Sequence, residues 1–457
     1  MDPRPTRGSR AEAVVESIDA RGRGLARVGA YSLRIRGAVP GDRVLARIRR
    51  IRHRRREADA QLDALIEAGV PRCAARCSHF GLCGGCIWQD LAYEEQLRLK
   101  QEMVQTCLRE AGLDFQLEDP LPADVPFGYR NKMEFSFSES RDGGLDLGLH
   151  VGGRFDRILD LESCHLQSER SDRIVDWVRA FARERGLSAY HLKRHEGLLR
   201  FLTIREGKRS GEVMVVVTTS GEAFPDASDL GKGLTRAFPD IRSVIHSINR
   251  RKAQVAIGDD EIVIAGSGTV HEELGEYRFE ISPSSFFQTN TLQAERLYGL
   301  VSDLATPGPD DRVLDVYCGT GGISIYLSNE VSKVIGVEMV EPAVRDAIRN
   351  SANNGIANCR FIAGSAEDVL SQLKDQGERF ETAIADPPRP GMHPKALTAL
   401  VDLEPERIIY VSCNPEALGN DLRALEIAGY RSDHVQLVDM FPHTPHCEVV
   451  ARVGRCG

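Results

Sequence analysis

The stretch Arg312-Val-Leu-Asp-Val-Tyr317-Cys-Gly-Thr-Gly-Gly322 decides the fold of the second half of the chain. Its first six residues predict a buried strand, and the glycines after it predict a tight loop that opens a helix at Ile323. Four more strands are expected at residues 333–338, 359–363, 382–386 and 409–413, with helical patterns such as residues 342–353 between them. Strands that alternate with helices indicate an α/β fold with a doubly wound parallel sheet.

Reactive and polar residues stand at the carboxyl ends of these expected strands. The first ends at Tyr317, the second at Glu338, the fourth at Asp386 and the fifth at Cys413. Ligands of doubly wound sheets bind at this edge, where the strand order reverses. We therefore expect these side chains to line one pocket.

The last two expected strands bring a carboxylate to the same edge. Residues 435–440 are expected to form a sixth parallel strand and residues 447–453 a final one, with only the turn at residues 441–446 between them. A connection this short requires antiparallel pairing. The final strand then starts where the parallel strands end, so Glu448 should face the pocket of Cys413.

The loop after the first strand indicates a nucleoside cofactor. Its glycines let the backbone approach a ligand closely, and Glu338 is placed to accept hydrogen bonds from both ribose hydroxyls. Such a loop could also belong to a dehydrogenase. The sequence lacks the G-x-G-x-x-G fingerprint, however, and the turn Asp386-Pro-Pro-Arg-Pro-Gly391 has no place in it.

The first 60 residues differ in charge from the rest of a chain whose net charge is −8. They contain sixteen arginines, no lysine and seven acidic residues. Alternating stretches at residues 13–18, 32–36 and 43–48, separated by glycines, predict a small β-barrel over residues 1–67. Its outward arginines, and the run Arg49-Arg-Ile-Arg-His-Arg-Arg-Arg56, suit contacts with RNA phosphates.

A group of cysteines follows the expected barrel. Cys77, Cys83 and Cys86 have a close, loop-compatible spacing, and Gly84-Gly85 lets the backbone fold tightly around a metal. The candidates for the required fourth thiolate are Cys73, Cys107 and Cys164. With Cys73 as the fourth ligand, the set would form a zinc knuckle.

Residues 68–285 are expected to form a middle domain of α+β type. Residues 91–113 predict a long amphipathic helix, and four strands are expected at residues 132–138, 198–205, 212–219 and 243–249. Residues 286–457 then form the doubly wound domain, whose first helix, residues 292–304, has Thr289 or Asn290 as its cap.

The tetrapeptide Ser412-Cys-Asn-Pro415, the Asp386 turn and Glu448 resemble the active-site motifs of the RNA uracil-5-methyltransferases, and the resemblance extends over nearly the whole chain. It implies a Rossmann-like methyltransferase domain that uses S-adenosylmethionine. It also implies that Cys413 attacks carbon 6 of uracil, that carbon 5 accepts the methyl group, and that Glu448 removes the proton from carbon 5. A buried structural thiol and a surface acid are the alternatives for these two residues.

The resemblance also assigns ligands. It places cofactor contacts at Gln288, Tyr317, Glu338 and Asp386, whereas Gly322 and Ser365 depart from the Asn-like residue and the acid expected there. It favours a [4Fe-4S] cluster over zinc, with the ligands Cys77, Cys83, Cys86 and Cys164, and the barrel resembles the RNA-binding TRAM domain. These features are closest to the iron–sulfur-containing enzymes that modify 23S ribosomal RNA. A flipped uracil would be held by Phe286 or Phe287 together with Gln288.

The expected function is methylation of carbon 5 of a uridine in RNA, with 23S rRNA favoured and tRNA as the alternative substrate. A cytosine-5 enzyme would use the same cysteine chemistry, and a non-catalytic RNA-binding assembly factor is the alternative from another class. No apolar run approaches the length of a membrane span, and residues 1–10 lack the apolar core of a secretory signal. The eleven cysteines suit a reducing compartment, so a cytoplasmic monomer without membrane contact is expected.

Overall fold

Strand β15 lies in a seven-stranded sheet in the computed structural model, which describes residues 5–140, 142–221 and 223–456. The strand order is β17-β16-β15-β18-β19-β21-β20. β15 pairs with β16 and β16 with β17 in parallel, whereas β21 is antiparallel to both β19 and β20. The strands are β15 (Arg312–Val316), β16 (Lys333–Glu338), β17 (Cys359–Ala363), β18 (Thr382–Ala385), β19 (Arg407–Ser412), β20 (Tyr430–Val438) and β21 (Glu448–Arg455).

This sheet confirms the predicted α/β class, including the antiparallel final strand. β20 begins at Tyr430, earlier than predicted, and its pairing with β21 is interrupted by a bulge between Ser432 and His434. After the buried Tyr430, the next four residues of β20 alternate between exposed and half-buried, so they lack the apolar signal that marks a buried strand. Its boundary was therefore predicted too late.

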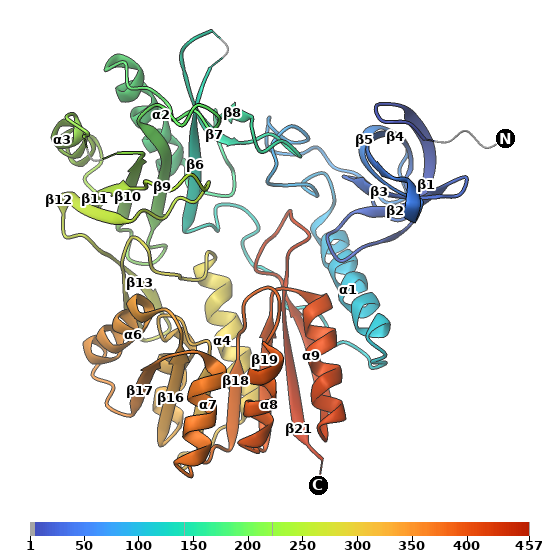
Figure 1. Ribbon diagram of the computed structural model, residues 1–457, viewed down its shortest axis with the longest axis vertical. Helices are drawn as coiled ribbons and strands as arrows, with labels where there is room; N and C mark the ends of the chain where they lie inside the picture. The colour runs from blue at the N-terminus through green and yellow to red at the C-terminus, as the bar shows by residue number, and fades with distance from the viewer. Residues whose placement is uncertain (1–4, 141, 222, 457) are drawn as a thin grey trace. The chain divides into compact units, whose positions relative to one another are not determined.

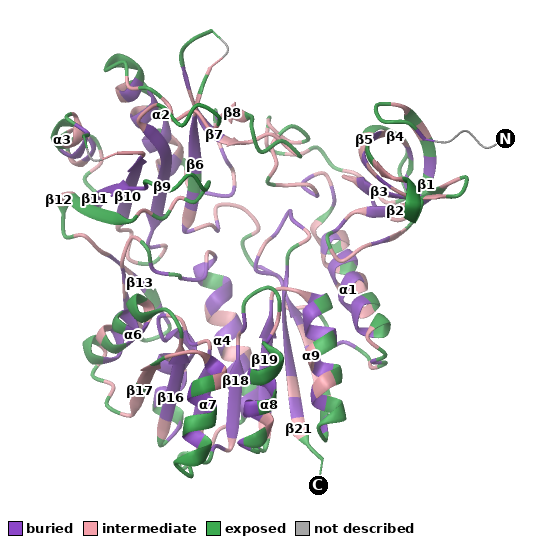
Figure 2. Ribbon diagram, in the orientation of Figure 1, coloured by how far each residue is buried: buried purple, intermediate pink, exposed green. Residues whose placement is uncertain are grey.

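Helices alternate with the strands of this sheet. They are α4 (Thr291–Ala305), α5 (Gly322–Leu327), the 3-10 turn η2 (Ser328–Glu330), α6 (Glu341–Asn353), α7 (Ala366–Asp375), α8 (Pro394–Asp402) and α9 (Pro415–Ile427). α9 buries Leu418, Leu422 and Leu425, one face of a helix, and its other face is exposed. Figure 2 shows the same division in α7, α8 and α9, while the strands β16, β18 and β19 are buried.

The N-terminal strands close into a barrel with the order β1-β2-β3-β5-β4, as predicted. Its core is made of aliphatic side chains, among them Val15, Leu33, Ile35, Val44 and Ile48. Each strand alternates inward and outward residues, which is the period that a barrel wall requires. The elements are β1 (Arg10–Ile18), β2 (Gly24–Val28), β3 (Tyr31–Arg36), β4 (Arg43–Arg52), the 3-10 turn η1 (His53–Arg55) and β5 (Glu57–Glu67).

A second seven-stranded sheet, of order β12-β11-β10-β9-β6-β7-β8, forms the middle of the chain. Four of its strands, β6, β9, β10 and β11, were predicted. β7, β8 and β12 were not. β8 has only three residues and β12 is mostly exposed, whereas β7 was missed although its leucines alternate with other residues. The elements are β6 (Lys132–Glu139), β7 (Leu145–His150), β8 (Ile158–Asp160), α2 (Glu169–Glu184), β9 (Leu199–Glu206), β10 (Val213–Thr219), α3 (Ala227–Ala237), β11 (Ile241–Ile248) and β12 (Asp260–Gly266), followed by the hairpin β13 (Val270–Leu274) and β14 (Tyr277–Ile281).

Contacts between residues divide the chain into two units. The first holds the chain up to Gly81, Cys86–Asp124 and everything from Ala383 on, and the second holds Leu82–Gly85 and Val125–Thr382. In the first unit, helix α1 (Tyr93–Glu110) packs against α9 (Figure 1). Over the described residues, we find no helix with the length and apolar content that a membrane crossing requires.

Candidate active site

Cys413 lies at the junction between β19 and α9. Asn414 caps the helix by accepting a hydrogen bond from the Glu416 amide at 3.2 Å, and Pro415 occupies the first helical position. The Ser412 hydroxyl accepts from the Asn414 amide at 3.2 Å. These bonds fix the backbone on both sides of Cys413, so its half-buried thiol has a defined position.

Glu448 is the first residue of β21, and the pairing of β21 with β19 brings it to Cys413. Ser412 is the Cα partner of Val449 in the antiparallel register, so the next position on each strand holds Cys413 and Glu448. On its other side Glu448 pairs with Val438 of β20. The Glu448 side chain is buried. The structure therefore brings together the thiol and the carboxylate that the sequence predicted to meet.

The turn after β18 is bound to the same helix terminus. Asn414 donates a side-chain hydrogen bond from Nδ2 to the Arg389 carbonyl at 2.8 Å. The Arg389 guanidinium lies 3.4 Å from Nδ1 of His446, in the loop that leads into β21. Arg389 thus spans the two segments that carry the thiol and the carboxylate. The sequence prediction did not assign it a role, although it is the only basic residue in the Asp386 turn.

Asp421 of α9 holds the end of this turn. Its Oδ2 accepts hydrogen bonds from the Met392 amide at 2.8 Å and from the Tyr410 hydroxyl. Gly391 has φ +87°, and a Cβ at this position would lie 2.6 Å from the same carboxylate oxygen. Only glycine fits this close approach without a shift of the backbone.

Burial and negative neighbours oppose ionisation of both groups. Burial, then Glu448 and Asp386, raise the pKa of Cys413 to about 11, while the Arg389 charge acts to lower it. Burial and the Asp386 carboxylate also raise the pKa of Glu448 well above its usual range, again against the effect of Arg389. The resting thiol is therefore protonated at neutral pH. Arg389 is the nearby positive charge that favours its thiolate.

The loop between β20 and β21 is anchored to α1. Lys100 and Asp439 form a fully buried ion pair at 2.5 Å, and the Lys100 ammonium also donates to the Phe441 carbonyl at 3.0 Å. The His443 amide donates to Oε1 of Gln96 at 2.7 Å. These contacts hold the segment that ends at Glu448. They join residues more than 300 positions apart, and no sequence pattern had marked them.

In the second unit, the loop after β15 has the form of a nucleotide-binding turn. The amides of Tyr317 and Cys318 donate to the Val337 carbonyl at 2.8 and 3.0 Å, and Tyr317 has φ +68°. The Glu338 carboxylate accepts the amides of Gly319 at 3.2 Å and Val340 at 2.8 Å. The carboxylate is thus held at the end of β16, and its oxygens can accept further hydrogen bonds. Gly319 has φ +55° and open space where a Cβ would lie, which leaves room for a ligand.

The segment before α4 places the two candidate aromatic residues differently. Phe287 is buried, with its ring 5.8 Å from that of Phe279, whereas Phe286 is 64% exposed. Gln288 is buried, and its carbonyl accepts from Nδ2 of Asn131 at 2.8 Å. Asn290 is the residue that caps α4, which settles one of the two predicted alternatives. Of the two phenylalanines, only Phe286 is open to stack on a base.

The two positions that depart from the expected pattern have local causes. At Gly322, a Cβ would lie 2.6 Å from the Tyr298 hydroxyl, so a larger side chain does not fit beside this tyrosine. Ser365 caps α7 by accepting the Asp368 amide at 3.3 Å, and its hydroxyl donates to the Asp368 carboxylate at 2.7 Å. Ser365 therefore serves the helix terminus.

The four predicted cluster ligands are divided between the units. Cys77 and Cys86 belong to the first unit, and Cys83 and Cys164 to the second. The Cys83 sulfur accepts the Gly85 amide at 3.4 Å, and the Cys86 sulfur accepts Nε2 of Gln89 at 3.7 Å. Within the described ranges, no three cysteine, histidine or acidic residues are gathered closely enough to hold a metal ion. The cluster thus stays a prediction.

The doubly wound sheet, the glycine loop with its fixed Glu338 and the paired thiol and carboxylate define the methyltransferase class of this fold. Residues 234–453 match the family model described as tRNA (Uracil-5-)-methyltransferase. The chain belongs to the RNA uracil-5-methyltransferase family.

Similar proteins cover nearly the whole chain. An uncharacterized RNA methyltransferase of Halalkalibacterium halodurans is 37% identical over 96% of both chains. One of Chlorobaculum tepidum is 40% identical over 90% of this chain and 89% of its own. The solved structure of Pyrococcus abyssi tRNA (uracil-54, C5)-methyltransferase, in complex with S-adenosyl-L-homocysteine, is 30% identical. It covers 97% of this chain and 100% of its own, with a TM-score of 0.77.

Proposed function

We propose that this protein methylates carbon 5 of a uridine in RNA through a covalent bond between Cys413 and carbon 6 of the base. The observation that carries this proposal is the register of β21 on β19, which places a buried carboxylate beside the thiol. Arg389 contributes the positive charge at the same place. A nucleophile, a base and a cation in one partly buried site are what this reaction requires.

The first step is attack by the Cys413 thiolate on carbon 6. Carbon 5 of uracil is a poor nucleophile, and a new bond from sulfur to carbon 6 shifts the ring electrons so that carbon 5 becomes enolate-like. The thiol must first release its proton to solvent, and Arg389 stabilises the resulting thiolate. S-Adenosylmethionine, when bound, supplies a methyl group on a positively charged sulfur. The enolate-like carbon 5 would bond to this methyl group with its electron pair, while the sulfur–methyl bond breaks and its electrons stay on the departing, now neutral, sulfur.

Glu448 completes the reaction by taking the proton from carbon 5. The electrons of that C–H bond restore the double bond to carbon 6, and the sulfur–carbon bond breaks to release the Cys413 thiolate. A raised pKa makes the Glu448 carboxylate a stronger base than an exposed glutamate. Transfer of this proton from Glu448 to the thiolate returns the site to its initial state.

We propose Gln288, Tyr317, Glu338 and Asp386 as the residues that bind the cofactor. Glu338 would accept the ribose hydroxyls, because its carboxylate is already oriented by two backbone amides. Exposed Phe286 would stack on the flipped uracil. Calorimetry tests the cofactor contact: Glu338→Gln should weaken binding of S-adenosylmethionine about tenfold, as expected for loss of a charge-assisted hydrogen bond. Unchanged affinity would remove Glu338 from the site.

We infer that Cys77, Cys83, Cys86 and Cys164 bind a [4Fe-4S] cluster. The spacing of the first three supports this, as do the N–H groups that already point at the sulfurs of Cys83 and Cys86. Elemental analysis and absorbance of anaerobically purified protein test the inference. About four iron atoms per chain are expected, and zinc without iron would indicate the alternative site with Cys73.

The barrel and the domain division belong to the same proposal. Residues 1–67 would form a TRAM-like RNA-binding module, residues 68–285 the cluster-bearing middle domain and residues 286–457 the catalytic domain. Several barrel arginines already pair with acids, such as Arg34 with Asp59 at 2.9 Å and Arg52 with Asp59 at 3.1 Å. The exposed residues 53–56 are therefore the barrel segment best placed for phosphate contacts.

We infer that the substrate is 23S rRNA, because the barrel and the cysteine motif occur together here. Transfer RNA is the second candidate, since the similar solved structure is that of a tRNA (uracil-54, C5)-methyltransferase. Mass spectrometry of RNA from a strain without this gene separates the two. Loss of one 5-methyluridine from 23S rRNA, restored by the wild type but not by Cys413→Ala, is expected. Loss of the modification from tRNA would identify tRNA as the substrate instead. No loss from either RNA would favour a non-catalytic assembly factor.

A further inference from the structure

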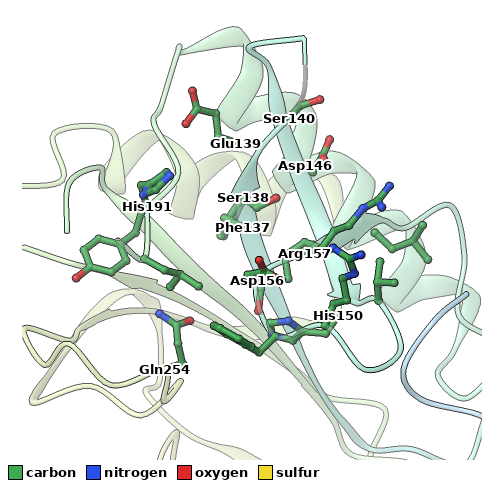
Figure 3. Close-up of a pocket in the computed structure, with 18 of the residues that line it drawn as sticks. Phe137, Ser138, Glu139, Ser140, Asp146, His150, Asp156, Arg157, His191 and Gln254 are labelled. Atoms are coloured by element: carbon green, nitrogen blue, oxygen red, sulfur yellow. The ribbon is translucent and has the colours of Figure 1, made fainter. Parts of the chain in front are cut away.

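A second pocket lies within the middle sheet, apart from the catalytic cysteine. It is formed by β6, by the connection between β7 and β8, and by residues 190–193, and its volume is about 680 Å³. Figure 3 shows His191 and Gln254 on one side of this pocket and His150 and Arg157 on the other. All of its lining residues belong to the second unit, and the proposed reaction uses none of them.

Four cations line the pocket without an ion-pair partner among the residues that the structure describes: Arg154, Arg157, Lys193 and Arg200. Of these, Arg200 already donates hydrogen bonds to the carbonyls of Asn249, Arg251 and Ala253. Two of the four lining acids are already neutralised by arginines that are not part of the wall. Glu139 pairs with Arg194 at 3.0 Å, and Asp160 pairs with Arg179 at 2.8 Å and Arg183 at 2.9 Å. Asp146 and Asp156 remain, and burial raises the pKa of Asp146. The unpaired charge at the rim therefore favours an anion.

Aromatic side chains stand beside these cations. Phe155 is 77% exposed, in the turn where the Arg154 amide donates to the Val151 carbonyl at 2.9 Å. The Tyr190 ring has the Arg200 guanidinium 4.5 Å from its centroid. A phenylalanine left this open in a basic, concave surface offers a stacking partner for a flat ring.

The pocket wall is fixed by the cysteine loop. The Gly84 amide donates to the His150 carbonyl at 2.8 Å, and the Gly152 amide donates to the Leu82 carbonyl at 2.9 Å. Nδ1 of His150, which lines the pocket, is buried and has no hydrogen-bond partner within the described ranges. The loop that carries Cys83 thus holds the strand end next to Arg154 and Phe155 in place, and His150 keeps an unused polar atom there.

We propose that this pocket is a subsite for an unpaired nucleotide of the substrate RNA, with its base stacked on Phe155 and its phosphate bound by Arg154, Arg157 and Lys193. Cations that meet a backbone phosphate beside an aromatic ring are how proteins bind single-stranded RNA without sequence preference. The volume accommodates one nucleotide. This inference rests on the proposed function, because it takes RNA as the ligand.

Fluorescence anisotropy of the full-length protein with a labelled (rU)15 oligonucleotide tests this subsite. In Phe155→Ala/Arg157→Gln, affinity should fall about tenfold, and the dependence of log affinity on log salt should decrease by roughly 0.7 for one lost phosphate contact. The matched control is Ile427→Ala/Arg431→Gln, which also removes an exposed apolar side chain and an exposed arginine. It should bind as the wild type does. Both variants should keep the wild-type melting temperature and affinity for S-adenosylmethionine.

Methylation kinetics and binding of free UMP distinguish an RNA subsite from the alternative explanations. We expect the pocket variant to raise KM for RNA and to leave kcat unchanged. Equal affinity of the pocket and control variants for (rU)15 would overturn the subsite while wild-type methylation still supported the proposed function. Wild-type protein that neither binds nor methylates RNA would overturn the proposed function itself. If UMP binds the wild type as tightly as (rU)15 does, and only UMP binding is lost in the variant, the pocket takes a free nucleotide instead.

Discussion

At Cys413 the surroundings disfavour the thiolate form of the sulfur. Burial and two carboxylates raise the pKa of the thiol to about 11, whereas the Arg389 charge and a backbone hydrogen bond act in the opposite direction. A site arranged in this way keeps the thiol protonated at neutral pH. Nucleophilic cysteines in other proteins rely on a neighbouring positive charge in the same manner. Replacing Arg389 therefore tests whether its charge stabilises the Cys413 thiolate.

Replacing Arg389 with Gln should raise the pKa of Cys413 further, because the charge that lowers it is removed. The rise of the alkylation rate with pH should then move to higher pH. Methylation at neutral pH should slow in proportion to the lost thiolate, about tenfold if this pKa rises by one pH unit. Iodoacetamide labelling of Cys413 across a pH series measures the change. Arg389→Lys, which keeps the charge, should restore most of the wild-type profile. Superimposable profiles for Gln and wild type would show that Arg389 does not act on the thiol.

Glu448→Gln should trap the enzyme on its substrate. Methyl transfer needs only the thiolate, whereas release needs the proton taken from carbon 5, so protein covalently bound to RNA should accumulate. A denaturing gel with radiolabelled RNA measures this species. Glu416→Gln, an exposed acid in the first turn of α9, is the control and should turn over normally. Rapid turnover by Glu448→Gln would remove it as the base.

At the scale of elements, most of the proposed site residues lie at the ends of strands, and the sequence pattern predicted where those strands end. Cys413 and Asp386 each follow an apolar strand, and the short turn before Glu448 requires an antiparallel partner. What could not be predicted depends on contacts between distant segments. Lys100 is an ordinary charged residue in a helical pattern, and only folding brings it to Asp439. The exposed strand β12 lacks the apolar alternation that would have revealed it.

Because the Asp386 turn packs closely against α9, replacing Gly391 should strongly reduce the stability of the protein. Gly391→Ala should destabilise the protein by about 2–4 kcal/mol, because φ +87° strains any side chain and the new Cβ meets Asp421 at 2.6 Å. Gly377→Ala has a similar φ, +74°, but no atom within 4 Å of its Cβ, so it should cost only about 1 kcal/mol. Urea unfolding measures both. Equal losses would mean that the close approach to Asp421 is unimportant.

The anchor between α1 and the loop before β21 predicts an effect on both stability and catalysis. Lys100→Met leaves the Asp439 carboxylate buried without its ammonium partner, at a cost of about 3–5 kcal/mol. The double variant Lys100→Met/Asp439→Leu should recover much of this loss, which urea unfolding would show. Its turnover should nevertheless stay low, because Phe441 also loses the Lys100 hydrogen bond that positions the loop. A single variant as stable as the wild type would contradict this account.

For the whole molecule, charge is distributed so that part of the basic barrel is internally balanced. Arg43 pairs with Glu12 and Arg47 with Asp63, so the sixteen arginines of the first 60 residues overstate the charge available to RNA. Sequence composition reports the number of cations but not their partners. The exposed residues 53–56 and the rim of the middle pocket are two places that remain open to phosphates.

The measurement that tests the central claim most directly is covalent capture by RNA that contains 5-fluorouridine. Fluorine at carbon 5 cannot be removed as a proton, so an enzyme that attacks carbon 6 stays attached after methyl transfer. Wild-type protein with S-adenosylmethionine should form an adduct that survives denaturation, and mass spectrometry should place it on Cys413. Cys413→Ala should bind the same RNA and form none. An adduct on another residue, or none with active wild-type protein, would contradict the assignment of Cys413 as the nucleophile.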